Sequence, residues 1–254
     1  MGLQELLVGG RPSLAVLIDP EKQNLDSLPI LIEVLASGAG DIILIGGSTE
    51  AQVNIDDLII KIKASCPQPV VLFPGHRNQL SPYADLLLLP SIISGQSYKY
   101  LIGEHIENAK QIRELDISVS STGYILMKGT KQSSTIRMTD SVPIDPIQFD
   151  EITSVSMAAE MIGFDSIYLE AGSGAKTPID PDIIIELKKA VNIPLIVGGG
   201  IDGISKLNEI ASVDPDIVVI GNILEEEPKL LIALYTELLK IQESKILKLS
   251  KSAQ

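Results

Sequence analysis

Short runs of apolar residues recur along the chain, separated by segments whose apolar residues are spaced as on one face of a helix. Most runs are continuously apolar, as expected of parallel strands that are covered on both faces. Eight runs are expected to be strands, over residues 14–18, 42–45, 70–73, 86–89, 117–127, 167–169, 195–197 and 217–220. Eight parallel strands in 254 residues predict one α/β domain over residues 1–254, a TIM (β/α)8 barrel. An open, doubly wound sheet is the alternative, but it leaves two edges to explain and usually has fewer strands.

The segments between these runs carry the usual signals of helix ends. Asp26 or Ser27 is expected to cap a helix that stops before Gly38, and Asp180 is a cap followed by Pro181 at the first helical position. A last helix is expected to open at residues 225–228, where acidic side chains suit the positive end of the helix dipole. Further helices are expected over residues 54–64, 98–115, 147–161 and 203–211.

Two connections break this alternation. Residues 74–82 begin and end with proline and are too short for a full helix, so we expect a barrel with an irregular or missing third helix. Residues 128–146 form a polar stretch that is long for a loop. Such a stretch is typical of a functional segment or a mobile one.

The bulk composition narrows the classes of function. A net charge of −13 argues against nucleic acid as a partner, because the phosphate backbone requires a basic face. A phosphorylated small molecule stays open, since backbone amides and a metal ion can supply local positive charge. The one cysteine, Cys66, excludes an internal disulfide and a cysteine-only metal cluster. The first residues do not resemble a signal peptide and no apolar run approaches the ~20 residues of a membrane span, so we expect a soluble cytoplasmic protein.

Three consecutive expected strands end in small residues. The sixth strand is followed by Glu170 and then by Gly172-Ser173-Gly174, the seventh by Gly198-Gly199-Gly200, and the eighth by Gly221-Asn222. Glycines let backbone N–H groups approach an oxyanion, and phosphate sites in such barrels lie at the last strands. One such cluster alone is as well explained by a tight turn. Three together predict a phosphate site.

Glu170 stands where the sixth strand ends, beside small residues that a ligand can approach. A carboxylate there can accept the proton of a hydroxyl group while its oxygen attacks an electrophile. The structural alternative is a glutamate held by a partner inside the barrel, but burial of Glu without a partner is uncommon, which favours the catalytic role. Tyr168 points the same way along the strand. Its hydroxyl either binds substrate or fills the barrel interior.

Asp19 directly follows the first apolar run. It could hold Mg²⁺, which binds through one or two carboxylates and leaves its other positions to water and substrate phosphates. Ser48, after the neighbouring strand, could offer a hydroxyl to the same ion. The structural alternative is that Asp19 caps the turn before Pro20 and that Ser48 caps the next helix. With two histidines in the whole chain, a histidine-rich metal site is not expected.

In this order, the motifs resemble the geranylgeranylglyceryl phosphate synthase family, which includes the heptaprenylglyceryl phosphate synthases. The likeness extends from about residue 14 to residue 222. The matching motifs are Leu17-Ile18-Asp19-Pro20, Gly46-Gly47-Ser48, Phe73-Pro74-Gly75, Tyr124-Ile125-Leu126, Tyr168-Leu169-Glu170-Ala171-Gly172-Ser173-Gly174, Gly198-Gly199-Gly200-Ile201 and Gly221-Asn222.

The resemblance implies a TIM barrel with an irregular third helical position and a Mg²⁺-dependent transferase of ether-lipid biosynthesis. The reaction it implies joins the prenyl group of a prenyl diphosphate, geranylgeranyl diphosphate foremost, to the primary hydroxyl of sn-glycerol 1-phosphate. It implies Mg²⁺ at Asp19 and Ser48, and Glu170 as the base. It implies that glycerol 1-phosphate is bound by Tyr168, Leu169, Glu170, Ala171, Gly172, Ser173, Gly174, Gly199, Gly200, Gly221 and Asn222. It also implies a homo-oligomer, either a dimer or an assembly of dimers, and any contact with a membrane surface is expected to be transient.

Two other functions stay open on the residues alone. A phosphate-binding isomerase or aldolase-like synthase shares the glycine sites, but a Schiff-base version needs a lysine at a strand end, where only Lys128 is placed. A non-catalytic barrel that binds a phosphometabolite would make Asp19 and Glu170 structural. Lys128, Lys131 and Arg137 either reach a diphosphate or are solvated. The sequence does not determine the prenyl length or the residues of the prenyl groove.

Overall fold

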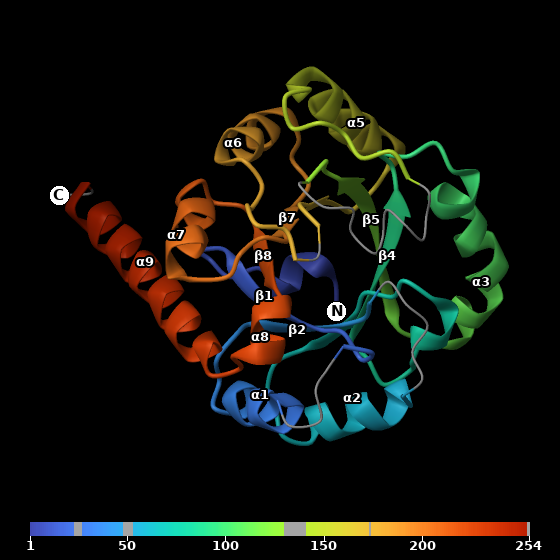
Figure 1. The fold of residues 1–254 in the computed structure, drawn as a ribbon, viewed down its shortest axis with the longest axis horizontal. Helices are drawn as coiled ribbons and strands as arrows, with labels where there is room; N and C mark the ends of the chain where they lie inside the picture. The colour runs from blue at the N-terminus through green and yellow to red at the C-terminus, as the bar shows by residue number, and fades with distance from the viewer. Residues whose placement is uncertain (23–26, 48–52, 130–140, 173, 253–254) are drawn as a thin grey trace.

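The eight strands form a closed parallel barrel in sequence order (Figure 1). The structure, a computed structural model, describes residues 1–22, 27–47, 53–129, 141–172 and 174–252. Ser13 of the first strand pairs with Ile217 of the eighth, which closes the barrel and confirms the predicted TIM fold. The strands are β1 (Ser13–Ile18), β2 (Ile42–Ile45), β3 (Val70–Leu72), β4 (Leu86–Ile92), β5 (Ser118–Leu126), β6 (Ser166–Glu170), β7 (Leu195–Gly198) and β8 (Ile217–Ile220).

Helices surround the barrel, and three of them begin or end at a capping residue, whereas Asp26, one of the two caps expected for the first helix, lies outside the described residues. The Asn54 side chain accepts hydrogen bonds from the first N–H groups of α2, and Asp180 accepts one from Asp182 at 3.0 Å at the start of α6. Gly163 ends α5 in the left-handed conformation, with a φ of 96°. The helices are α1 (Ser27–Ala36), α2 (Ile55–Lys63), α3 (Glu104–Glu114), α5 (Phe149–Ile162), α6 (Pro181–Ala190), α7 (Ile204–Ser212), α8 (Asn222–Glu226) and α9 (Leu230–Ser252).

The connection between β3 and β4 contains a single 3₁₀ turn, η2 (Arg77–Gln79), instead of a helix. The prediction of an irregular third helical position is therefore confirmed. Gln79 is fully buried, and its side-chain oxygen accepts hydrogen bonds from the backbone N–H groups of Gly47, at 3.3 Å, and Gly75, at 2.9 Å. One glutamine thus ties the loop after β2 to the loop after β3, where a packed helix is missing.

Two expected helices differ from the structure. Residues 98–115 are not one regular helix, because a π-helical turn, η3 (Lys99–Gly103), precedes α3. The expectation of one last helix opening at residues 225–228 was wrong, because the acidic residues Glu225 and Glu226 end the short helix α8 and the long helix α9 begins later. Pro228 explains the break, since it lacks an N–H group and disfavours helical geometry in the residue before it.

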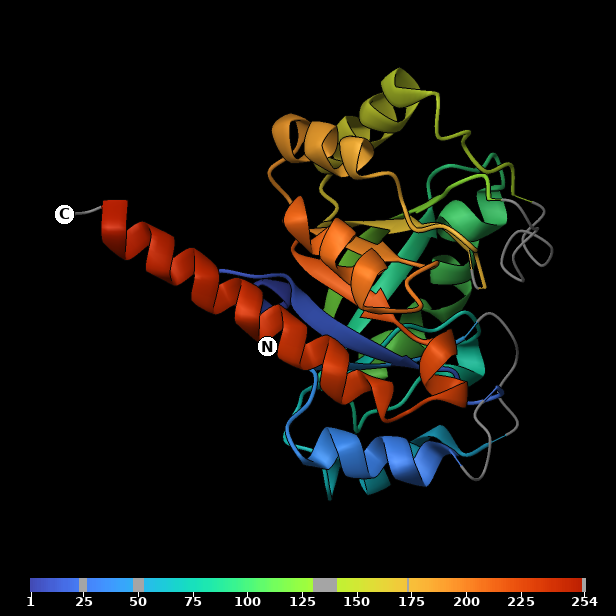
Figure 2. The ribbon, with the colours of Figure 1, turned by 60° about the vertical axis from the view of Figure 1, so that its left-hand side comes forward.

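Apolar side chains pack in two layers, one between the strands and the helices and one inside the barrel. At the amino ends of the strands, Leu3 and Leu6 of the 3₁₀ helix η1 (Leu3–Leu6) close the inner layer. Figure 2 shows α9 running beside the barrel and extending beyond it. Within the described ranges, no helix combines the length and the low charge needed to cross a bilayer.

Candidate active site

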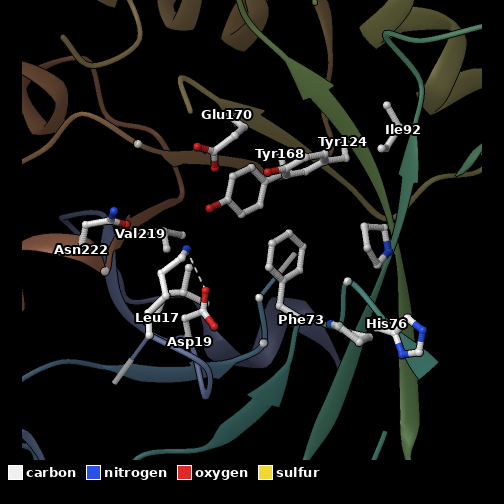
Figure 3. A pocket seen from close by; sticks show the side chains of 18 of the residues that line it. Leu17, Asp19, Phe73, His76, Ile92, Tyr124, Tyr168, Glu170, Val219 and Asn222 are labelled. Atoms are coloured by element: carbon white, nitrogen blue, oxygen red, sulfur yellow. Dashed lines mark ion pairs between the residues drawn. The ribbon is translucent and has the colours of Figure 1, made fainter. Parts of the chain in front are cut away.

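A cavity of about 660 Å³ opens where the strands end. In Figure 3, Glu170 and Tyr168 lie across this cavity from Asp19, and Phe73 and Tyr124 lie to one side. These side chains come from four different strands or the residues directly after them, as is usual for active sites of TIM barrels. The parallel barrel therefore brings together residues that are up to about 150 positions apart in the chain.

Glu170 is the last residue of β6, and only 9% of its surface is exposed. Its Oε1 accepts a hydrogen bond from the backbone N–H of Gly172 at 2.7 Å. The hydroxyl groups of Tyr124 and Tyr168 also donate hydrogen bonds to this carboxylate. The group is thus fixed in place by three donors, one of which, Tyr124, comes from the neighbouring strand β5.

Burial raises the pKa of Glu170 above its ordinary value, because desolvation disfavours the carboxylate. The N–H of Gly172, the two tyrosine hydroxyls and the charge of Lys22 act in the opposite direction and stabilise the ionised form. The pKa of Tyr168 is raised well above its ordinary value by burial and by the charge of Glu170. Tyr168 consequently stays protonated as a donor, while Glu170 has the environment of a general base.

The glycines after β7 leave room for these side chains. A Cβ at Gly198 would collide with the hydroxyl of Tyr168. At Gly199 a Cβ would lie 2.8 Å from Oε1 of Glu170, and the φ of +86° is strained for other residues. Gly198 and Gly199 therefore provide the space that the side chains of Tyr168 and Glu170 occupy.

The structure separates the predicted glycerol phosphate residues into two groups. Leu169 and Ala171 point outward into the layer beneath the helices, and the N–H of Ala171 bonds to the carbonyl of Gly198. Gly172 contributes its N–H to Glu170, and Ser173 lies outside the described residues. The predicted residues that line the cavity are Tyr168, Glu170, Gly174, Gly199, Gly200, Gly221 and Asn222.

Asp19 lies at the opposite side of the cavity, with 4% of its surface exposed. Its Oδ1 accepts a hydrogen bond from the N–H of Glu21 at 3.2 Å, and its Oδ2 lies 2.8 Å from the ammonium of Lys22. Gly47 packs so closely on this carboxylate that a Cβ there would collide with it. Lys22 was missed by the sequence reasoning, although it follows Asp19 by three residues.

The carboxylate of Asp19 is a suitable ligand for a Mg²⁺ ion whose other ligands are the phosphate oxygens of a substrate. Among the described residues, no three His, Cys, Asp or Glu side chains converge on one point. Asp19 would therefore contribute a single carboxylate, which is the way Mg²⁺ binds when substrate phosphates complete its coordination. Ser48, the other expected ligand, lies outside the described residues.

The remaining wall, between β4 and α3, is lined mainly by apolar side chains, with Lys99, Glu104, His105 and Asn108 among them, and the sequence reasoning assigned none of its residues to a ligand. Phe73 stacks on Tyr168 with ring centroids 5.0 Å apart and is tilted against Tyr124 at 5.7 Å. Beyond these rings, His105 on α3 is hydrogen-bonded to Ser91 at 2.7 Å, and burial lowers its pKa. The apolar side chains of this wall are Leu80, Leu89, Ile92, Tyr100 and Ile112. This arm of the cavity can hold a long hydrocarbon chain.

The basic side chains near the cavity differ in position. His76 and Arg77 line the cavity at its mouth, where they follow Phe73 and Pro74. Lys128 pairs with Asp145 at 3.1 Å, is mostly exposed and is not part of the cavity wall. Because Lys128 lies outside the cavity, it is poorly placed to form a Schiff base with a bound substrate. Lys131 and Arg137 lie outside the described residues.

Comparison with known proteins agrees with this geometry. Residues 11–239 match the model of the PcrB family. A geranylgeranylglyceryl phosphate synthase of Spirosoma linguale is 34% identical over 95% of this chain and 97% of its own, and one of Zunongwangia profunda is 39% identical over 84% of this chain and 90% of its own. A solved structure of (S)-3-O-geranylgeranylglyceryl phosphate synthase from Thermoplasma acidophilum in complex with sn-glycerol-1-phosphate superposes with a TM-score of 0.82 at 27% identity, covering 91% of this chain and 94% of that one.

Proposed function

Because this chain belongs to the PcrB family, we propose that it joins a prenyl group to sn-glycerol 1-phosphate through an ether bond and releases diphosphate. The observation that carries the proposal is the buried Glu170, held by three donors beside the glycine-rich ends of β6, β7 and β8. It faces Asp19 across a cavity that continues into an apolar arm. The barrel thus offers one place each for an anion, a base and a hydrocarbon chain.

The acceptor binds on the side of the cavity that holds Glu170, and the diphosphate of the donor binds on the side that holds Asp19. The loops that hold Gly199 and Asn222 bind the phosphate of the acceptor, so that its primary hydroxyl lies near Glu170. The bond between the prenyl carbon and the diphosphate oxygen breaks, and its electron pair leaves with diphosphate. The hydroxyl oxygen forms the new bond to that carbon, and its proton passes to Glu170.

Asp19 would hold Mg²⁺ together with Ser48, and the ion would supply the positive charge that offsets the departing diphosphate. The apolar side chains of the arm between β4 and α3 would hold the prenyl chain, and the charged residues there, Lys99 and Glu104, pair with each other at 3.2 Å. The stacked rings of Phe73 and Tyr168 lie between the two ends of the cavity. They shield the reacting carbon from water while it carries positive charge.

The reaction is tested by incubating the purified protein with Mg²⁺, sn-glycerol 1-phosphate and prenyl diphosphates of rising length. An ether-linked prenylglyceryl phosphate, identified by mass spectrometry, is the expected product, with geranylgeranyl diphosphate as the first candidate donor. The enantiomer sn-glycerol 3-phosphate and a reaction with a chelator serve as controls. Absence of ether product with every donor contradicts the proposal.

We further propose that the protein acts in the cytoplasm as a homo-oligomer and touches membranes only transiently. Support for the oligomer comes from exposed apolar side chains on two adjacent helices, namely Met157, Met161 and Ile162 of α5 and Ile185 of α6. Met161 is 77% exposed, which is unusual for an apolar side chain in such a group. Light scattering on the protein and on Met161→Glu tests the assignment, because a charge in the interface is expected to give monomers.

A further inference from the structure

The side chain of Lys22 lies among the acidic groups of the cavity. Its ammonium is 2.8 Å from Oδ2 of Asp19, the pair drawn as a dashed line in Figure 3. The same charge acts on Glu170 at the end of β6 and on Glu225 in α8. One ammonium is therefore placed among three carboxylates that come from the loop after β1, from β6 and from α8.

Asp19 depends on this ammonium in the free protein. The carboxylate is 4% exposed, and a buried charge is costly unless a partner of opposite charge lies close to it. Lys22 keeps a third of its side chain exposed, so its ammonium has a path away from Asp19 into the cavity. A lysine suits such a movement, because its compact charge sits on a flexible four-carbon stem.

A divalent cation and an ammonium compete for the same oxygen. Two positive charges within about 4 Å repel each other, so a metal ion at Asp19 favours the departure of Lys22 from Oδ2. A prenyl diphosphate brings negative oxygens to the same end of the cavity and offers the ammonium a new partner. Glu170 and Glu225 also line the cavity and attract the same ammonium.

Resting on the proposed function, we propose that Lys22 occupies the carboxylate of Asp19 in the free protein and moves to the diphosphate of the prenyl donor when the metal binds. Lys22 is then a binding residue for the leaving group. No bond to Lys22 forms or breaks, and its proton stays on Nζ. Only the ion pair changes, from carboxylate to diphosphate, while the electron pair of the broken C–O bond leaves with diphosphate.

This exchange predicts that Lys22→Met binds the metal ion more tightly and the prenyl diphosphate more weakly than the wild type. Binding of Mn²⁺ to the protein without substrates, followed by electron paramagnetic resonance, is expected to become about tenfold tighter, because a competitor is removed. In the assay with Mg²⁺, the KM for the prenyl diphosphate is expected to rise about tenfold. The KM for glycerol phosphate should change much less. A residue with a merely structural role would not improve metal affinity.

Lys22→Arg keeps the positive charge, so its Mn²⁺ affinity is expected to stay near that of the wild type. Lys188→Met is the matched control, because Lys188 has a similar exposure and pairs at 3.0 Å with Asp216, which lies directly before β8, at the opposite end of the barrel. It should alter neither metal binding nor the KM for the donor. Circular dichroism melting curves establish that all three variants are folded.

Unchanged or weaker Mn²⁺ binding by folded Lys22→Met overturns the competition with the metal. Tighter Mn²⁺ binding with an unchanged KM for the donor overturns the transfer to diphosphate. If the wild-type protein forms no ether product while Lys22→Met still binds Mn²⁺ more tightly, the proposed function is wrong and the pairing of Lys22 with the metal position is supported. The two proposals therefore fail separately.

Discussion

The carboxylate of Glu170 and the backbone N–H of Gly172 form a hydrogen bond of 2.7 Å. This bond joins the proposed base to the first glycine of the loop after β6. The hydrogen bond fixes the carboxylate relative to the backbone of this loop. A substitution that moves this loop is therefore expected to move the carboxylate of Glu170 as well.

Glu170→Gln is expected to lower kcat by about 10²–10⁴-fold, because an amide cannot take the proton of the attacking hydroxyl. The substitution keeps the size of the side chain and an oxygen that can accept the N–H of Gly172. Single-turnover assays of ether formation measure the effect. Retention of more than a tenth of the wild-type rate, in a folded variant, would remove Glu170 from the role of base.

The acid limb of the kcat profile is expected above the ordinary pKa of a glutamate, because burial raises the pKa of Glu170. The hydroxyl of Tyr124 stabilises the ionised form, so Tyr124→Phe should move this limb to higher pH and lower the rate most at acidic pH. Tyr83→Phe, at an exposed position, is the control. A limb that moves to lower pH in Tyr124→Phe contradicts the assignment.

Gly199→Ala is expected to cost about 1–3 kcal/mol of folding free energy and to abolish ether formation, since its φ is +86° and the new Cβ would lie 2.8 Å from Oε1 of Glu170. Gly203→Ala is the matched control four residues away, where a Cβ would meet no described atom within 4 Å. Thermal melting and assays of both variants make the comparison. Equal activity of the two variants would contradict the proposed crowding.

Ile112→Trp is expected to shorten the prenyl chain that the protein accepts, because a larger side chain fills the apolar arm between β4 and α3. The ratio of kcat/KM for farnesyl diphosphate to that for geranylgeranyl diphosphate should rise about tenfold or more. Ile106→Trp places the same bulk on the exposed side of α3 and should leave the ratio unchanged. An unchanged ratio in Ile112→Trp would place the prenyl chain elsewhere.

Arg11→Met is expected to lower the free energy of unfolding by about 3 kcal/mol without altering kcat. The Arg11–Asp41 pair is nearly buried, at side-chain exposures of 3% and 10%, and Tyr235 of α9 donates to the same carboxylate. Lys63→Met is the control, since the Lys63–Asp85 pair is also 2.6 Å long but is 38% and 26% exposed, and its loss should cost below about 1 kcal/mol. Equal losses measured by denaturant unfolding would show that burial is not the cause.

Much of the site could be predicted because the chemistry of each strand end is local. Asp19 and Glu170 both follow apolar runs directly, and in a parallel barrel such positions meet at one end. Lys22, Phe73 and the apolar arm could not be placed in this way. Their roles depend on which neighbours pack against them, and a lysine three residues after an aspartate has no distinctive spacing by itself.

The order of the strands, the loss of the third helix and the glycine-rich ends of β6, β7 and β8 were determined by the sequence alone, since they follow from apolar periodicity and from the backbone limits of proline and glycine. Only the tertiary structure decided that the N–H of Gly172 donates a hydrogen bond to Glu170 and that Lys22 forms an ion pair with Asp19. It also decided that Leu169 and Ala171 face away from the cavity. The paired residues are close in the chain, but their spacing alone does not select these partners. These relations arise from closure of the barrel, which sets the distance and direction of each side chain after the local pattern has set its strand.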